Sequence, residues 1–117
     1  MTPEQVVDAL RASGCVFAEE EAALLLAAPG ALDELLARRI AGEPLEQVLG
    51  WAEFDGLRIG VVPGVFVPRR RSELLVRLAA EGLDAGAVAV DLCCGSGALG
   101  AALRARVPAI ELHACDL

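Results

Sequence analysis

Two carboxylates and a glycine-rich turn are the residues of this sequence whose types and spacing suit ligand binding. Gly95, Ser96 and Gly97 directly follow an apolar run. Glycine lets a backbone turn sharply and lets a ligand approach without meeting a Cβ atom. Asp91 precedes the turn, and Asp116 follows Gly97 by 19 residues. This combination predicts a nucleoside site at the ends of two neighbouring strands.

The two acids also indicate which nucleoside the site takes. An acid placed like Asp116 accepts hydrogen bonds from ribose hydroxyls in NAD sites and in S-adenosyl-L-methionine sites alike. Asp91 discriminates between them, because a carboxylate beside a pyrophosphate sets like charges at short range. S-adenosyl-L-methionine has no phosphate and carries an ammonium and a sulfonium, so we expect this cofactor. Gly95-x-Gly97-x-x-Gly100 also matches the dinucleotide pattern, which leaves an NAD(P)-binding oxidoreductase as the alternative.

These residues require a strand before the turn and a helix after it. The short run 88–92 is apolar and β-favouring, which predicts a buried strand. Residues 98–105 are good helix formers. A second apolar run, 109–115, predicts the next parallel strand, with Asp116 at its tip.

The first 50 residues have the pattern of a small helical bundle. Thr2-Pro3-Glu4-Gln5 predicts a helix start, with a hydroxyl cap, proline at the first helical position and a glutamine that closes a capping box. Apolar residues recur in three further helical stretches, 18–28, 31–41 and 44–49, which glycine or proline separates.

The character of the chain changes after this bundle, at Gly50. Alternation over 57–61, then Pro63-Gly64, then the apolar residues 65–67, predicts a β-hairpin that turns at the Pro-Gly pair.

Three consecutive arginines follow the predicted hairpin. Arg69, Arg70 and Arg71 usually form a solvated face, and the alternative is a segment that contacts an acidic partner or the ligand site. Ser72 is expected to cap the following helix, over residues 73–83.

Composition excludes several classes of protein. The chain has 117 residues, of which 56% are hydrophobic, and a net charge of -7. The negative charge argues against direct nucleic-acid binding, which depends on neutralising phosphates. The sequence contains no apolar run of the roughly 18 residues that cross a membrane, and its polar N-terminus does not resemble a signal peptide. We therefore expect a cytoplasmic protein without a membrane partner.

The four cysteines are Cys15, Cys93, Cys94 and Cys115. Adjacent cysteines do not have the spacing of zinc ligands, and His113 and Cys115 fall on one predicted strand with no turn between them. We expect reduced thiols near the ligand turn and no metal site, with a redox switch as the alternative.

Four sequence blocks follow one another in a specific order: GEPLEQVLG at 42–50, EFDGL at 53–57, PGVFVPR and SE within 63–73, and DLCCGSGA at 91–98. This order is similar to that of the protein glutamine-amide methyltransferases that modify peptide chain release factors. The resemblance implies a helical substrate-recognition domain at 1–50 and a β-hairpin linker at 51–72. It further implies that 73–117 is the first part of an α/β, Rossmann-like, class I methyltransferase domain that uses S-adenosyl-L-methionine.

The resemblance carries the family's cofactor loop onto Cys93, Cys94, Gly95, Ser96 and Gly97, and its ribose-binding acid onto Asp116. Cys93 stands where the family usually has glycine, so its side chain must point away from the ligand. The expected protein partner is a peptide chain release factor.

The family's catalytic Asn-Pro-Pro-Tyr motif is absent, because the chain contains no asparagine and no tyrosine. In the family, the Asn side chain and a proline carbonyl hold the substrate amide nitrogen in line with the methyl group. We therefore expect an N-terminal fragment with half a cofactor site, no catalytic residue and an unpaired strand edge at 88–92. The further alternative is a non-catalytic adaptor that binds a protein through residues 2–49.

Overall fold

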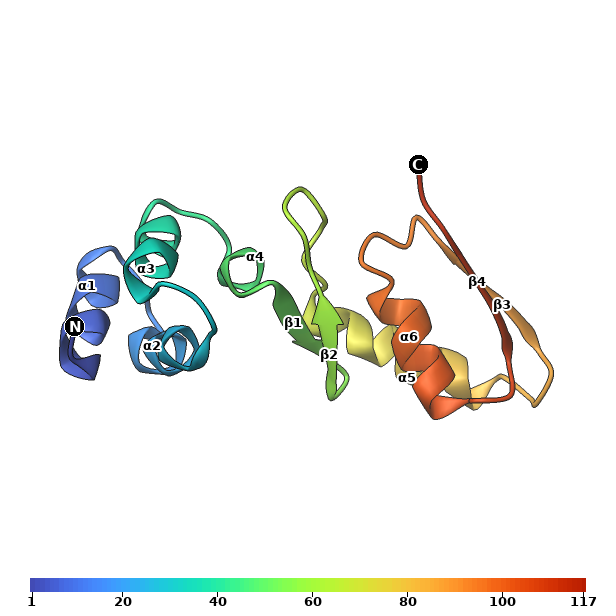
Figure 1. The fold of residues 1–117 in the computed structure, drawn as a ribbon. Coiled ribbons are helices and arrows are strands. Elements are labelled where there is room, and N and C mark those ends of the chain that lie inside the picture. The colour runs from blue at the N-terminus through green and yellow to red at the C-terminus, as the bar shows by residue number, and fades with distance from the viewer. The chain divides into compact units, whose positions relative to one another are not determined.

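The computed structural model describes all 117 residues, and the chain divides into two compact units, residues 1–50 and 51–117 (Figure 1). The first unit contains α1 (Pro3–Ala12), α2 (Ala18–Ala27), α3 (Leu32–Ile40) and α4 (Leu45–Leu49). The second contains β1 (Trp51–Phe54), β2 (Leu57–Gly60), the 3-10 turn η1 (Arg70–Ser72), α5 (Glu73–Glu81), β3 (Val88–Leu92), α6 (Ala98–Arg106) and β4 (Glu111–Cys115). The fold is thus mixed α/β, and none of its helices has the length and apolar character needed to span a membrane.

The predicted capping box begins α1. The Thr2 hydroxyl accepts from the Gln5 N–H at 3.2 Å, and the Gln5 side chain accepts from the Thr2 N–H at 2.8 Å. Two of the four N–H groups that a helix start leaves unpaired are satisfied in this way.

Apolar faces of the four helices form the core of the first unit. Val6 and Leu10 of α1 are fully buried and pack with Leu25 of α2 and Leu36 of α3. Arg39 adds a polar link between α2 and α3, because its guanidinium lies 3.0 Å from the Glu21 carboxylate.

The predicted hairpin exists, but its predicted turn is wrong. β1 and β2 pair antiparallel around Asp55 and Gly56, whose φ angles of 51° and 78° form a two-residue turn with both positions left-handed. That geometry matches the twist of a hairpin, and Asp-Gly favours it. Pro63 and Gly64 form a separate tight turn, closed by the Val65 N–H to the Val62 carbonyl at 3.1 Å, and residues 65–67 are not a strand.

The helix after the arginines also starts differently from the prediction. Arg70–Ser72 forms a 3-10 turn, so Ser72 already has helical backbone angles and its side chain makes no capping bond to α5. An N-cap residue needs an extended backbone to aim its hydroxyl at the first turn.

The predicted order of strand, helix and strand is confirmed, but the prediction that the first strand is buried is wrong, because β3 has no buried residue. β3 and β4 pair in parallel, with Val88 opposite Glu111 and Leu92 opposite Cys115. Side chains alternate across a strand, so Asp91 and Leu112 lie on the same face of the sheet. This is the face that α6 covers (Figure 1). Asp116 directly follows β4, at the edge of the sheet where the glycine turn leaves β3.

The opposite face of this two-stranded sheet is uncovered. Val88, Val90 and Leu92 are 61%, 61% and 73% exposed, and β3 pairs only with β4. Leu74, Leu75 and Leu78 of α5 are exposed as well. Such surfaces favour association, as the sequence predicts for the edge of β3.

Candidate functional site

The turn between β3 and α6 is built from left-handed residues. The φ angles of Cys93, Gly95 and Gly97 are 58°, 54° and 80°. This conformation costs a residue with a Cβ about 1–2 kcal/mol, whereas glycine adopts it freely. The turn therefore explains why the sequence has two glycines here, and it places a strained cysteine at the end of β3.

Space lies open above the turn. A Cβ atom built on Gly95 or Gly97 would meet no other atom within 4 Å. A cavity of about 680 Å³ adjoins the turn, within the size range of small-molecule sites. Its wall includes, from the predicted site, Cys93, Cys94, Gly95, Ser96 and Asp116.

Asp116 faces this cavity and is held by the turn. Its Oδ2 accepts from the Gly95 N–H at 2.7 Å, and its Oδ1 accepts from the Leu117 N–H at 2.7 Å. These two donors hold the pKa of the Asp116 carboxyl below its usual range. A carboxylate has about four acceptor sites, so Asp116 retains capacity for two ligand hydroxyls.

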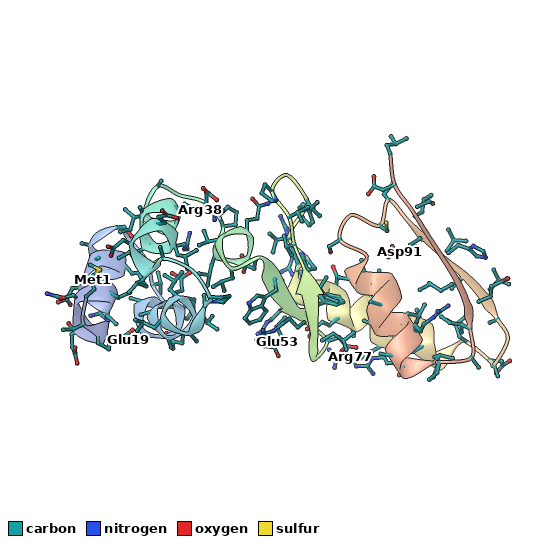
Figure 2. All side chains as sticks on the ribbon, viewed as in Figure 1. Met1, Glu19, Arg38, Glu53, Arg77 and Asp91 are labelled. Atoms are coloured by element: carbon teal, nitrogen blue, oxygen red, sulfur yellow. The ribbon has the colours of Figure 1, made fainter.

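Asp91 lies elsewhere than the sequence suggests. It points between β3 and α6 (Figure 2), and its Oδ2 accepts from the Gly100 N–H at 3.0 Å. It is not among the residues that line the cavity. A Cβ on Gly100 would lie 3.1 Å from this carboxylate oxygen and 3.3 Å from Leu112 Cδ2, so the third glycine of the pattern serves close packing of α6 on the sheet.

The negative charge of Asp91 nevertheless affects the Cys94 thiol in the turn. Burial raises the pKa of the Cys94 thiol, and the carboxylates of Asp91 and Asp116 raise it further. An anion is therefore disfavoured at this turn by two neighbouring negative charges.

The second wall of the cavity comes from the hairpin and the segment after it, which the site prediction missed. This wall includes Phe54, Phe66, Arg69 and Ser72. The Arg69 guanidinium lies 5.4 Å from the centre of the Phe66 ring. Arg70 instead pairs with Glu53 at 3.6 Å, with both side chains exposed. The sequence did contain one signal for this wall, the arginine run at 69–71. Contact with the ligand site was one of the alternatives given for that run.

Comparison with curated proteins identifies relatives over most of this chain. The chain is 46% identical over 88 residues to a release factor glutamine methyltransferase of Streptomyces coelicolor, a match of 72% of this chain and 31% of the relative. It is 45% identical over 87 residues to the enzyme of the same name from Mycolicibacterium smegmatis, a match of 69% of this chain and 31% of the relative. It is 36% identical over 109 residues to a 4-amino-L-phenylalanine/4-methylamino-L-phenylalanine methyltransferase of Streptomyces pristinaespiralis, covering 77% and 37%. No protein-family model matches.

These relatives all carry methyltransferase names, which agrees with the expected family and not with the oxidoreductase alternative. The chain spans about a third of the length of the curated relatives it matches. Over the matched part of its length, the chain is similar to release factor glutamine methyltransferases.

Proposed function

We propose that the cavity beside the glycine turn binds the nucleoside part of S-adenosyl-L-methionine. The observation that carries this proposal is the joint placement of Asp116 with Gly95 and Ser96 of the open turn on one cavity wall. Asp116 would accept hydrogen bonds from the ribose hydroxyls, as acids at this position do in nucleoside sites. Gly95, which lines the cavity, would allow the ligand to approach the backbone.

The charges near the turn support a cofactor without phosphate. S-adenosyl-L-methionine supplies an electrophilic methyl group on a positive sulfonium. Asp91 and Asp116 disfavour a diphosphate at this place by like-charge repulsion. Arg69 is the one cation among the residues that line the cavity. It lies over Phe66 in the wall that the hairpin segment contributes.

We further propose that residues 73–117 form the first part of a Rossmann-like domain. The parallel β3 and β4 joined by α6 are the repeating unit of such sheets, and ligands in them bind at the carboxyl ends of the strands. The relatives, about three times as long as the matched region, support the idea that this unit is part of a larger sheet.

The proposed reaction is transfer of the methyl group to a glutamine side-chain amide of a peptide chain release factor, as the names of the relatives indicate. An amide nitrogen is a poor nucleophile, so the reaction depends on exact placement of the acceptor. The chain has no asparagine or tyrosine, and thus no Asn-Pro-Pro-Tyr motif. Its own residues would bind and orient the cofactor, and alone it would not transfer a methyl group.

The helical unit, residues 1–50, is the proposed site of protein recognition. It carries nine acidic residues against three arginines, so most of the chain's negative charge lies here. Val16 and Phe17, between α1 and α2, are 84% and 67% exposed beside the acidic start of α2. An apolar contact with an acidic rim suits a partner surface that is apolar and basic.

A second candidate is methyl transfer to an aromatic amine of a small molecule. The Streptomyces pristinaespiralis relative, with 109 aligned residues, supports this acceptor. Both candidates share the cofactor site, so cofactor binding does not separate them. A release factor that binds the chain with an affinity sensitive to Phe17→Ser would favour the protein acceptor.

The cofactor proposal is tested by isothermal titration of the full chain with S-adenosyl-L-methionine, its demethylated product S-adenosylhomocysteine, and NAD. We expect heat of binding with the first two ligands and none with NAD. Binding of NAD alone would support the oxidoreductase alternative, and binding of none of the three ligands would contradict the proposed cofactor site.

A further inference from the structure

We propose that the ion pair between Asp55 and Arg106 is a positioning device that fixes the distance between the two walls of the cavity. This role rests on the proposed function, because it concerns the geometry of the same site. Neither residue lines the cavity, and they lie 51 positions apart in the sequence.

The contact has the geometry of a two-point clamp. Arg106 Nε donates to Asp55 Oδ2 at 2.7 Å, and Arg106 Nη2 donates to Asp55 Oδ1 at 2.7 Å. The Asp55 side chain is only 11% exposed. The backbone N–H of Asp55 also donates to Glu73 Oε1 at 2.7 Å. One turn residue is thus tied to the end of α6 and to the start of α5.

The two ends of the clamp belong to the two walls. α6 begins directly after Gly97 of the ligand turn and ends at Arg106, so a rigid helix of about 13 Å joins the turn to the clamp. Asp55 directly follows Phe54, whose buried ring also lines the cavity. A shift of Asp55 relative to Arg106 would therefore move Phe54 relative to the glycine turn.

Other contacts between the hairpin and α6 are apolar. Phe54 and Ile59 pack with Ala98 and Ala102 in one buried cluster. Leu99 and Leu103 of α6 pack against this cluster, and apolar contacts of this kind are non-directional. A planar guanidinium that binds both oxygens of a carboxylate fixes direction as well as distance. The Asp55–Arg106 pair is therefore the contact that fixes the orientation of the hairpin relative to α6.

The test compares Arg106→Lys, which keeps the charge but loses the fork, with Asp55→Asn, in which asparagine still tolerates the left-handed backbone. Arg104→Gln, which removes a charge from the same turn of α6, is the matched control. We expect the affinity for S-adenosylhomocysteine to fall about tenfold in both clamp variants and to stay at the wild-type value in the control. A loss of stability alone would not reduce the affinity of the molecules that remain folded.

A second readout needs no ligand. The chain has three phenylalanines, Phe17, Phe54 and Phe66, so fluorophenylalanine labelling gives three ¹⁹F resonances. We expect Arg106→Lys to shift the resonances of Phe54 and Phe66, whereas Phe17, in the other unit, is the internal reference. Unchanged Phe54 and Phe66 resonances in folded Arg106→Lys would overturn the clamp, whatever the wild type binds. Shifted resonances in a chain that binds no S-adenosylhomocysteine would support the clamp and refute the proposed function.

Discussion

The Gly95 N–H donates a hydrogen bond of 2.7 Å to the Asp116 carboxylate, which joins the turn after β3 to the tip of β4. The two residues are 21 positions apart, and both line the cavity. The carboxylate thus shapes the turn while its remaining acceptor sites face the space where a ligand would lie. Asp116 therefore contributes to the fold of the turn and to the proposed binding site.

Removing the charge of Asp116 tests this double role. In Asp116→Asn, the amide oxygen can still accept from Gly95, but the charged acceptor for ribose hydroxyls is lost. We predict an affinity for S-adenosylhomocysteine about tenfold or more below that of the wild type, measured by titration calorimetry. Glu111→Gln, at the other end of β4, removes the same charge and should change little. Equal losses in both variants would mean that only the net charge matters.

Gly100 allows α6 to approach the sheet. Gly100→Val would push methyl groups into the Asp91 carboxylate and Leu112, so we predict a free energy of unfolding about 2 kcal/mol lower than in Ala101→Val. Ala101 is exposed on the same helix, so its variant introduces the same side chain without the overlap. Helix propensity alone favours Gly100→Val over Ala101→Val, so a lower stability of Gly100→Val would come from the overlap. Urea unfolding followed by the fluorescence of Trp51, the only tryptophan, measures both. Similar values would show that the α6 packing is loose at this position.

Cys93 carries the strain of the turn. Cys93→Gly should raise the free energy of unfolding by about 0.5 kcal/mol, because relief of the left-handed backbone outweighs the added flexibility of the unfolded chain. Cys115→Gly, in the extended backbone of β4, should lower it by a similar amount. The same Trp51 assay compares them, and a destabilised Cys93→Gly would indicate that the cysteine side chain makes a contact that matters.

The Asp55–Arg106 pair predicts a dependence of stability on pH. Hydrogen bonds from Arg106 hold the pKa of the Asp55 carboxyl below its ordinary value. Their stabilisation is therefore complete above the ordinary carboxyl pKa of about 3.9 and is lost as pH falls through the lowered pKa. Between about pH 5 and pH 2, wild-type stability should decline more steeply than that of Asp55→Asn. Parallel curves for the two proteins would contradict the pairing.

Local signals in the sequence were sufficient for much of this fold. Thr2 and Gln5 predict the start of α1, because both groups of the capping box lie within one turn. Glycines at 95 and 97 predict the sharp turn, which the structure builds from left-handed residues, and the spacing to Asp116 predicts the tip of a parallel strand. Each of these features depends on neighbouring residues or on a single β-α-β unit, so no distant contact had to be known.

Two kinds of feature were not predictable in this way: those for which two segments of the sequence could form the same turn, and those that depend on packing between distant segments. The hairpin turn was predicted at the Pro-Gly pair, 63–64. Both this pair and the Asp-Gly pair at 55–56 form turns, but only the Asp-Gly turn joins the two paired strands, because its geometry matches hairpin twist. Period-two alternation places Asp91 on one face of β3, yet the position of α6 decides that this face is covered. The wall that contains Phe54 and Phe66 comes from segments far from the glycine turn in the sequence, which no local pattern reveals.

Amide chemical shifts of the ¹⁵N-labelled chain during titration with S-adenosylhomocysteine test the proposed site most directly. We predict the largest changes at Gly95, Ser96, Gly97 and Leu117, where the ligand would meet the turn and the residue beside Asp116. Changes confined to residues 1–50, or no changes at a saturating concentration of the ligand, would contradict a cofactor site at this turn.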